Sequence, residues 1–295
     1  MESSSPLSFY GYSVAYFDTN VYGTLVQQPD SWRPISDYLL ENNLLLGVSD
    51  VNVLELSSAP GLHRDLARFL LRVPSALFKP ASRIMAEEVE GYLNGEEVNP
   101  LLGPIASLPL ESDHPVGYLE AFLRREVVTT TRSVMEQRKE EFEKRILETL
   151  ENFDPVVGDN YTEADGPYYA FQLIWLQILC QDHPRCAARI RDEMGSGWQP
   201  HLPSVAPQFR GLWLFALAQF YRYYLHRRKP AGNDYGDLIQ AVSVPYCSVA
   251  ILERGLSEDL SHIKGNDPVL RHTAVHDLGF LRELIGLPLF RNHSA

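Results

Sequence analysis

Four acidic residues lie where a carboxylate could act on a ligand. Asp18 and Glu253 each follow a short apolar run, Asp237 lies in the first turn of a predicted helix that leads into such a run, and Glu55 lies on a helix that follows another. In a parallel sheet, strand ends and the N-termini of the following helices share one edge, so acids from distant parts of the sequence can converge there. We therefore expect one acidic site, with the position of Asp237 depending on topology.

Clustered carboxylates favour one kind of chemistry. They cannot all ionise at neutral pH unless a cation lies between them. Ligand sets made only of oxygen suit Mg²⁺ or Mn²⁺. One or two such ions can activate a water and stabilise the leaving oxygen in phosphodiester hydrolysis. We predict that Asp18, Glu55, Asp237 and Glu253 are catalytic and hold the metal.

The elements that must position these acids are indicated by hydrophobic patterning. Apolar runs of four to six residues bounded by polar turn formers predict strands buried on both faces. Ser, Asn and Asp residues supply N-caps for the helices that follow. The predicted strands are residues 13–17, 44–49 and 249–252, and the helices beside them are 51–57, 235–244 and 255–263, with a further strand or helix over 275–285.

The middle of the chain has a different pattern of predicted secondary structure. Residues 74–229 show no alternation of strand and helix, and helical patterns recur at 81–93, 116–153, 168–180 and 209–228. We predict an α/β domain formed from residues 1–73 and 230–295, with residues 74–229 as a large, mainly helical insertion that shapes access to the site, binds a protein partner or mediates self-association.

Four segments in this order resemble the PIN-domain family of metal-dependent nucleases. They are Val14-Ala15-Tyr16-Phe17-Asp18-Thr19-Asn20, Val53-Leu54-Glu55-Leu56, Asp234-Tyr235-Gly236-Asp237-Leu238 and Pro245-Tyr246-Cys247-Ser248-Val249-Ala250-Ile251-Leu252-Glu253. The resemblance covers about the first 70 and the last 65 residues. It implies a three-layer PIN-like fold with a central parallel sheet, and cleavage of RNA or single-stranded nucleic acid, for which we favour single-stranded RNA. A toxin or defence effector is a natural setting by family analogy alone.

The resemblance also implies roles for individual residues. Asp18, Glu55 and Asp237 would ligand a metal or its water, and Glu253 would replace the fourth acid, which is usually aspartate. Asn20 and Asp234 would hold these ligands in place or serve as alternative ligands. The sequence departs from the family pattern at two positions. Glu253 lengthens the acidic arm by one methylene, which can weaken or shift a second metal, and Ser248 stands where relatives often carry an acid.

Ordinary structural roles compete with these assignments. Asp18 in Asp-Thr-Asn also suits a turn or a helix cap. Glu55 could pair with Arg64 or Arg68 as a helix acid. Asp234 and Asp237 also fit a plain helix start, where carboxylates favour the positive end of the dipole.

A basic and aromatic stretch precedes the last acids. In residues 220–229, bases could contact phosphates and aromatic rings could stack on unpaired bases; the bases considered are Arg222, Arg227, Arg228 and Lys229. An aromatic core face with a cationic helix end explains the pattern equally well. His272 and His276 lack a third nearby ligand, and we treat them as surface or packing residues.

Composition and net charge limit the ligands and the cellular compartment that suit this chain. The net charge of −12 disfavours a general binder of nucleic acid or of membrane surfaces, although a local basic face with metal can still serve a nuclease. Three cysteines without metal spacing favour a reducing cytoplasm. The first residues show no signal-peptide pattern, and the longest apolar runs are too short to span a bilayer, so no membrane association is expected.

Two other function classes compete with the nuclease. One is a catalytically weakened PIN-like binding or scaffold protein that acts through its helical insertion, which the net charge and Glu253 mildly favour. The other is a hydrolase of small phosphates that uses the same acids, but the sequence has no nucleophile elbow and no Gly-rich phosphate loop.

Overall fold

The computed structural model describes residues 11–105, 133, 136–144, 146–148, 161–174, 179, 182–194 and 208–286. Within these residues, six strands form one sheet in the order β4-β3-β2-β1-β5-β6. All neighbours are parallel except β4, which runs antiparallel to β3. The strands are β1 (Ser13–Phe17), β2 (Leu44–Val48), β3 (Ser75–Phe78), β4 (Leu101–Pro104), β5 (Val249–Leu252) and β6 (Ala274–Asp277). The α/β prediction is confirmed.

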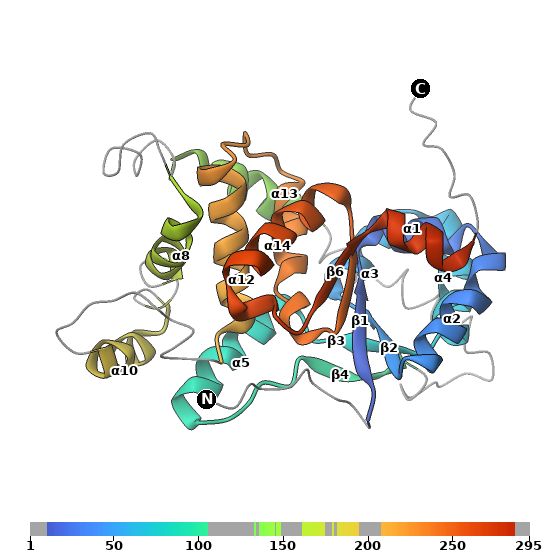
Figure 1. Cartoon of the computed structure of the whole chain (residues 1–295), viewed down its shortest axis with the longest axis horizontal. Helices are drawn as coiled ribbons and strands as arrows, with labels where there is room; N and C mark the ends of the chain where they lie inside the picture. The colour runs from blue at the N-terminus through green and yellow to red at the C-terminus, as the bar shows by residue number, and fades with distance from the viewer. Residues whose placement is uncertain are drawn as a thin grey trace.

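Helices cover both faces of this sheet (Figure 1). One face carries α1 (Thr19–Val26), α2 (Trp32–Glu41), α4 (His63–Arg72) and α15 (Leu278–Ile285). The other carries α5 (Ala81–Asn94), α8 (Gly166–Ile174), α10 (Pro184–Met194), α12 (Arg210–Gln219), α13 (Asp234–Ala241) and α14 (Arg254–Asn266). The helix α3 (Asp50–Leu56) follows β2.

Alternate residues of the strands enter two different cores. Val14 and Tyr16 of β1 belong to the core on the α12 side, whereas Ala15 and Phe17 belong to the core on the α1 side. Successive side chains of a strand point to opposite faces, so a strand that is apolar throughout must be covered on both. This is the physical reason why short apolar runs predicted these strands correctly.

Two strands of the central sheet are not predicted from the sequence. Strands β3 and β4 lie within residues 74–229, the range assigned to a helical insertion, yet both belong to the central sheet. Pro74 and Pro80 flank β3, and Pro100 precedes β4, which itself ends in Gly103 and Pro104, so these short segments resemble loops in the sequence.

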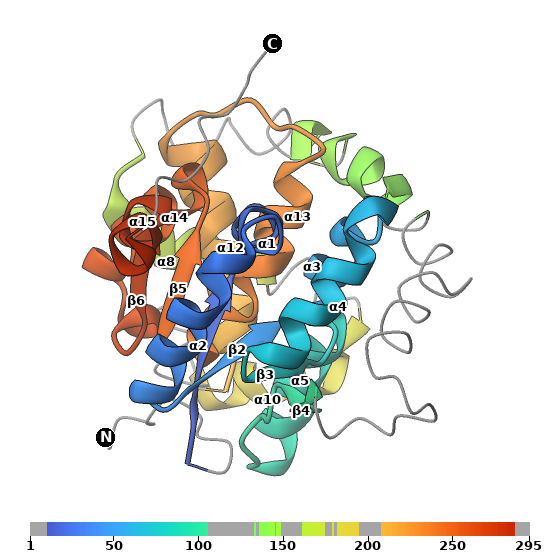
Figure 2. The same ribbon diagram turned by 90° about the vertical axis from the view of Figure 1, so that its right-hand side faces the viewer.

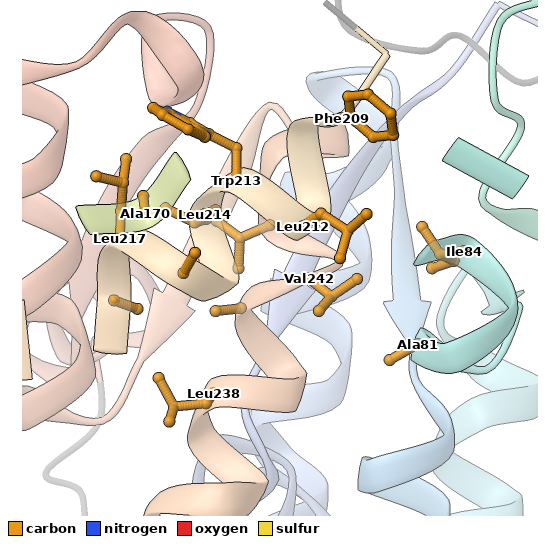
Figure 3. Close-up of a cluster of buried hydrophobic side chains, with 14 of the residues drawn as sticks. Ala81, Ile84, Ala170, Phe209, Leu212, Trp213, Leu214, Leu217, Leu238 and Val242 are labelled. Atoms are coloured by element: carbon orange, nitrogen blue, oxygen red, sulfur yellow. The ribbon is translucent and has the colours of Figure 1, made fainter. Parts of the chain in front are cut away.

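The helical segment also shares its core with the sheet. Helix α12 is buried on nearly all sides, as expected for a helix that is apolar all round. Figure 3 shows Leu212, Leu214 and Leu217 of this helix among side chains of α5, α8 and α13. Most of the predicted helix over 116–153 lies outside the described residues, although 136–144 and 146–148 are helical. Among the described helices, none is long and apolar enough to cross a membrane.

A buried carboxyl group joins three of these elements. Glu88 of α5 is fully buried and accepts hydrogen bonds from the backbone N–H groups of Gly211 (2.5 Å) and Leu212 (2.9 Å) and from the hydroxyl of Tyr246 (2.5 Å). It therefore caps the N-terminus of α12 from another helix and holds the turn before β5. A Cβ on Gly211 would lie 2.9 Å from Glu88 Oε1 and 2.7 Å from the carbonyl oxygen of Val242, so only glycine allows this approach.

We predict that Glu88 makes stability depend on pH. Burial raises the pKa of Glu88 from its ordinary value of 4.5 to about 7, so the folded state binds more protons than the unfolded state between these values. Stability from this group is therefore complete below about pH 4.5 and is lost as pH rises through 7, by up to about 3 kcal/mol. Urea unfolding of the wild type and Glu88→Gln at several pH values should show this difference in slope. Parallel pH curves for the two proteins would contradict it.

Candidate active site

The predicted acids lie at the carboxyl edge of the sheet. Asp18 is the N-cap of α1 directly after β1, and Glu253 is the N-cap of α14 directly after β5. Glu55 lies on α3, and Asp237 lies in the first turn of α13. In Figure 2, α1, α3 and α13 lie near one another at this edge, in agreement with the contacts of α3 with the other two helices.

Asp18 holds the ends of two strands together. Its Oδ1 accepts hydrogen bonds from the backbone N–H groups of Asn20 (2.8 Å) and Val21 (3.1 Å), which is a helix cap. Its Oδ2 accepts the backbone N–H of Glu253, 235 residues away in sequence. The cap role that competed with catalysis is therefore present, and it places Asp18 against Glu253.

Glu253 is the point on which the other acids converge. Its Oε2 accepts a hydrogen bond of 2.5 Å from the side-chain amide of Asn20. Its charge also contributes to raising the pKa of Asp18, Glu55 and Asp237. The structure thus places all four acids at one edge of the sheet, where the charge of Glu253 acts on the other three and Asn20 contacts both Asp18 and Glu253.

Burial is the largest cause of each of these pKa shifts. It raises the pKa of Asp18 to about 6 and outweighs three backbone hydrogen bonds. It also raises the pKa of Asp237 to about 6, although Arg222 acts in the opposite direction. The pKa of Glu55 is raised by burial, against a hydrogen bond from Thr19 and the charge of Lys139. The negative charge of this edge is therefore only partly compensated, which is common at functional sites.

Neighbouring polar residues that the sequence did not single out order the edge. The amide of Asn52 donates to the hydroxyl of Thr19 (3.2 Å) and completes a capping box with Ser49. Lys139 lies within the helical residues 136–144, and its Nζ is 4.0 Å from Glu55 Oε1. That segment, green in Figure 2, lies beside α3 and α13, where Phe142 contacts Tyr235. The capping box of Ser49 and Asn52 follows a short sequence spacing, whereas the contacts of Asn52 with Thr19 and of Lys139 with Glu55 form only in the folded chain.

Asp234 has a different environment from the four acids. It is buried, and its oxygens accept from Arg222 Nη1 (3.2 Å), Arg228 Nη2 (2.9 Å), Tyr223 Oη (3.2 Å) and the backbone N–H of Ala231 (3.0 Å). With four donors around two oxygens, little capacity remains to bind a metal. The structure gives this residue a place in an ion-pair network rather than at the acidic edge.

The four basic residues considered for nucleic-acid binding fall into one buried residue and three exposed ones. The side chain of Arg222 is fully buried among aspartates, so it offers no surface to a nucleic acid and the expectation of a phosphate contact there is wrong. Arg227, Arg228 and Lys229 are exposed. Arg228 Nη1 lies 3.5 Å from the position that a Cβ would take on Gly255, so Arg228 lies beside the N-terminus of α14 and near Glu253. His276 lies in β6 and stacks on Phe280, and His272 lies in the turn before that strand.

The donor set suits a hard divalent cation. All four acids supply oxygen, and the site has a net negative charge that a cation would neutralise. Within the described part of the chain, no three acid, histidine or cysteine side chains are close enough to hold a metal together. Mg²⁺ usually keeps several waters and takes only one or two carboxylates directly, so a site in which one or two acids bind the ion and the others hold its waters would suit it.

Comparisons of the chain with protein-family models, curated proteins and solved structures find no match.

We predict that two acids on the same helix contribute very differently to stability. Asp234→Asn removes one partner from a buried ion-pair network and should destabilise the fold by about 3 kcal/mol. Asp237→Asn leaves Arg222 two other partners and relieves repulsion from Glu253, so it should cost less than about 1 kcal/mol. Chemical denaturation of both variants measures the difference. Equal losses would show that Asp237 is as structural as Asp234.

Proposed function

We propose that this chain is a PIN-like, metal-dependent endonuclease that hydrolyses phosphodiester bonds in single-stranded RNA. The observation that supports it most strongly is the convergence of Asp18, Glu55 and Asp237 on Glu253. Acids with raised pKa values at the carboxyl edge of a parallel sheet are typical of a ligand site. The choice of RNA and the PIN-like identity rest on the resemblance of the four sequence segments.

In this proposal, Asp18, Glu55, Asp237 and Glu253 surround Mg²⁺ or Mn²⁺, with one or two of these acids binding the ion directly and the others holding its waters. When bound, such an ion lowers the pKa of a water and offsets charge on the phosphate oxygens. Asn20 keeps the carboxylate of Glu253 in place through its 2.5 Å hydrogen bond. The longer arm of glutamate at position 253 suits this role, because its backbone is already fixed by the bond from its N–H to Asp18.

Substrate phosphates would meet positive groups at the rim of the site. Arg228 is about half exposed and lies beside the N-terminus of α14, where backbone N–H groups also favour anions. Lys139 lies on the other side, next to Glu55. These two bases would hold the strand across the acids in a chain whose overall charge is negative.

A second candidate is a scaffold protein with a PIN-like core that no longer cuts. Two ion pairs favour it: Glu55 with Lys139, and Asp237 with Arg222 at 3.0 Å. Each offsets part of the charge of an acid without any metal. In this case the helical segment would bind a protein partner or a second copy of the chain.

One assay separates the two candidates. Labelled single-stranded RNA and DNA are incubated with the protein and Mn²⁺, Mg²⁺ or EDTA. We expect RNA cleavage with Mn²⁺ or Mg²⁺, none with EDTA, and a loss of at least about 100-fold in Asp18→Asn and Glu253→Gln. Asp37→Asn, which changes an exposed acid of α2, is the matched control and should cut normally. Cutting that persists in Asp18→Asn would refute the site, and no cutting of either substrate would favour the scaffold.

A further inference from the structure

Arg222 is the most deeply buried charged side chain near the acidic edge. It lies in a π-helical turn, Phe220–Leu225, that continues α12, and its side chain has no exposed surface. The backbone N–H of His226 donates to the carbonyl of Tyr221, the five-residue step of a π turn. Such turns are rare and are often found at functional sites. Burying a guanidinium is costly unless it is fully paired, so its partners are informative.

Three aspartates from two helices surround this guanidinium. Nε donates to Asp259 of α14 (3.0 Å), and Nη1 donates to Asp234 (3.2 Å) and Asp237 (3.0 Å) of α13. Asp234 and Asp237 are three residues apart, so both lie on one face of α13. Arg222 therefore joins α12 and α14 to the face of α13 that carries a proposed catalytic acid.

The contact with Asp237 is made to one oxygen only. Oδ2 accepts from Arg222, and no described residue donates to Oδ1. The side chain of Asp237 is 29% exposed, whereas that of Asp234 is 1% exposed. Arg222 thus fixes the rotamer of Asp237 from inside the protein and leaves its second oxygen available on the open side.

We infer that Arg222 is a positioning residue of the proposed metal site, acting through Asp237. This inference rests on the proposed function. Side chains that hydrogen-bond to metal ligands orient them, and removing such a partner typically weakens metal affinity 10- to 100-fold. Lysine cannot replace arginine here, because a single ammonium cannot span Asp259 on one helix and Asp237 on another as a planar guanidinium does.

The test is a double-mutant cycle on Mn²⁺ affinity, measured by electron paramagnetic resonance of free Mn²⁺ without any substrate. We expect Arg222→Lys to weaken Mn²⁺ binding 10- to 100-fold relative to the wild type. In an Asp237→Asn background, the same change should have no further effect, because the residue through which it acts is gone. A purely structural role predicts either no effect or the same fold-change in both backgrounds.

Two further variants keep the test decisive. Arg189→Lys is the matched control. The guanidinium of Arg189 also donates to two acceptors, Glu193 and the carbonyl of Leu93, on a distant surface. It should bind Mn²⁺ like the wild type. If Arg222→Lys fails to fold by circular dichroism, Asp259→Asn loosens the same guanidinium at Nε and should weaken Mn²⁺ binding only when Asp237 is present.

The possible outcomes distinguish a failure of the proposed role of Arg222 from a failure of the proposed function. A wild type that binds Mn²⁺, with folded Arg222 and Asp259 variants that bind it equally well, would overturn the role of Arg222 and leave the proposed function standing. A wild type that binds no Mn²⁺ would overturn both.

Discussion

The rest of the structure depends on the contact between Asp18 and the backbone of Glu253. It ties the ends of the neighbouring strands β1 and β5, and it brings the backbone of the exposed Glu253 against the buried carboxylate of Asp18. Burying these carboxylates is unfavourable, and the charge of Glu253 adds to the effect, so the pKa values of Asp18 and Asp237 are both raised. Keeping these carboxylates buried lowers the stability of the fold at neutral pH, because the unfolded chain ionises them more readily.

The helical part of the chain supports this edge. Glu88 connects α5 to the start of α12 and to the turn before β5, while Arg222 connects the end of the same helix to α13 and α14. Helix α12 is therefore joined to its neighbours by buried polar contacts at each end, and its apolar residues pack into the core between these contacts. Because both anchors lead to elements that carry proposed site acids, the segment first interpreted as an insertion is part of the framework of the site.

Much of this could be predicted from the sequence, and the failures have physical causes. Strands β1, β2 and β5 were found because burial on both faces requires continuous apolar runs. The acid after β1 and the acid after β5 followed from them, since their place depends on local chain direction alone. Arg222 was misjudged because alternating aromatic and basic residues look alike in a buried helix and on a nucleic-acid surface. Arg222 contacts both Asp234 and Asp237, and Asp234 differs by its contacts with Arg228, Tyr223 and the backbone of Ala231, which form only in the folded chain.

The central claim is that the four acids form a divalent-cation site. Crystals soaked in Mn²⁺ and measured near the manganese absorption edge test it most directly, since anomalous scattering locates the ion independently of activity. The account predicts an anomalous peak bounded by Asp18, Asp237 and Glu253, and its loss in Glu253→Gln crystals. A map without a peak at this edge, at a Mn²⁺ concentration that saturates Mn²⁺ sites elsewhere on the protein surface, would contradict it.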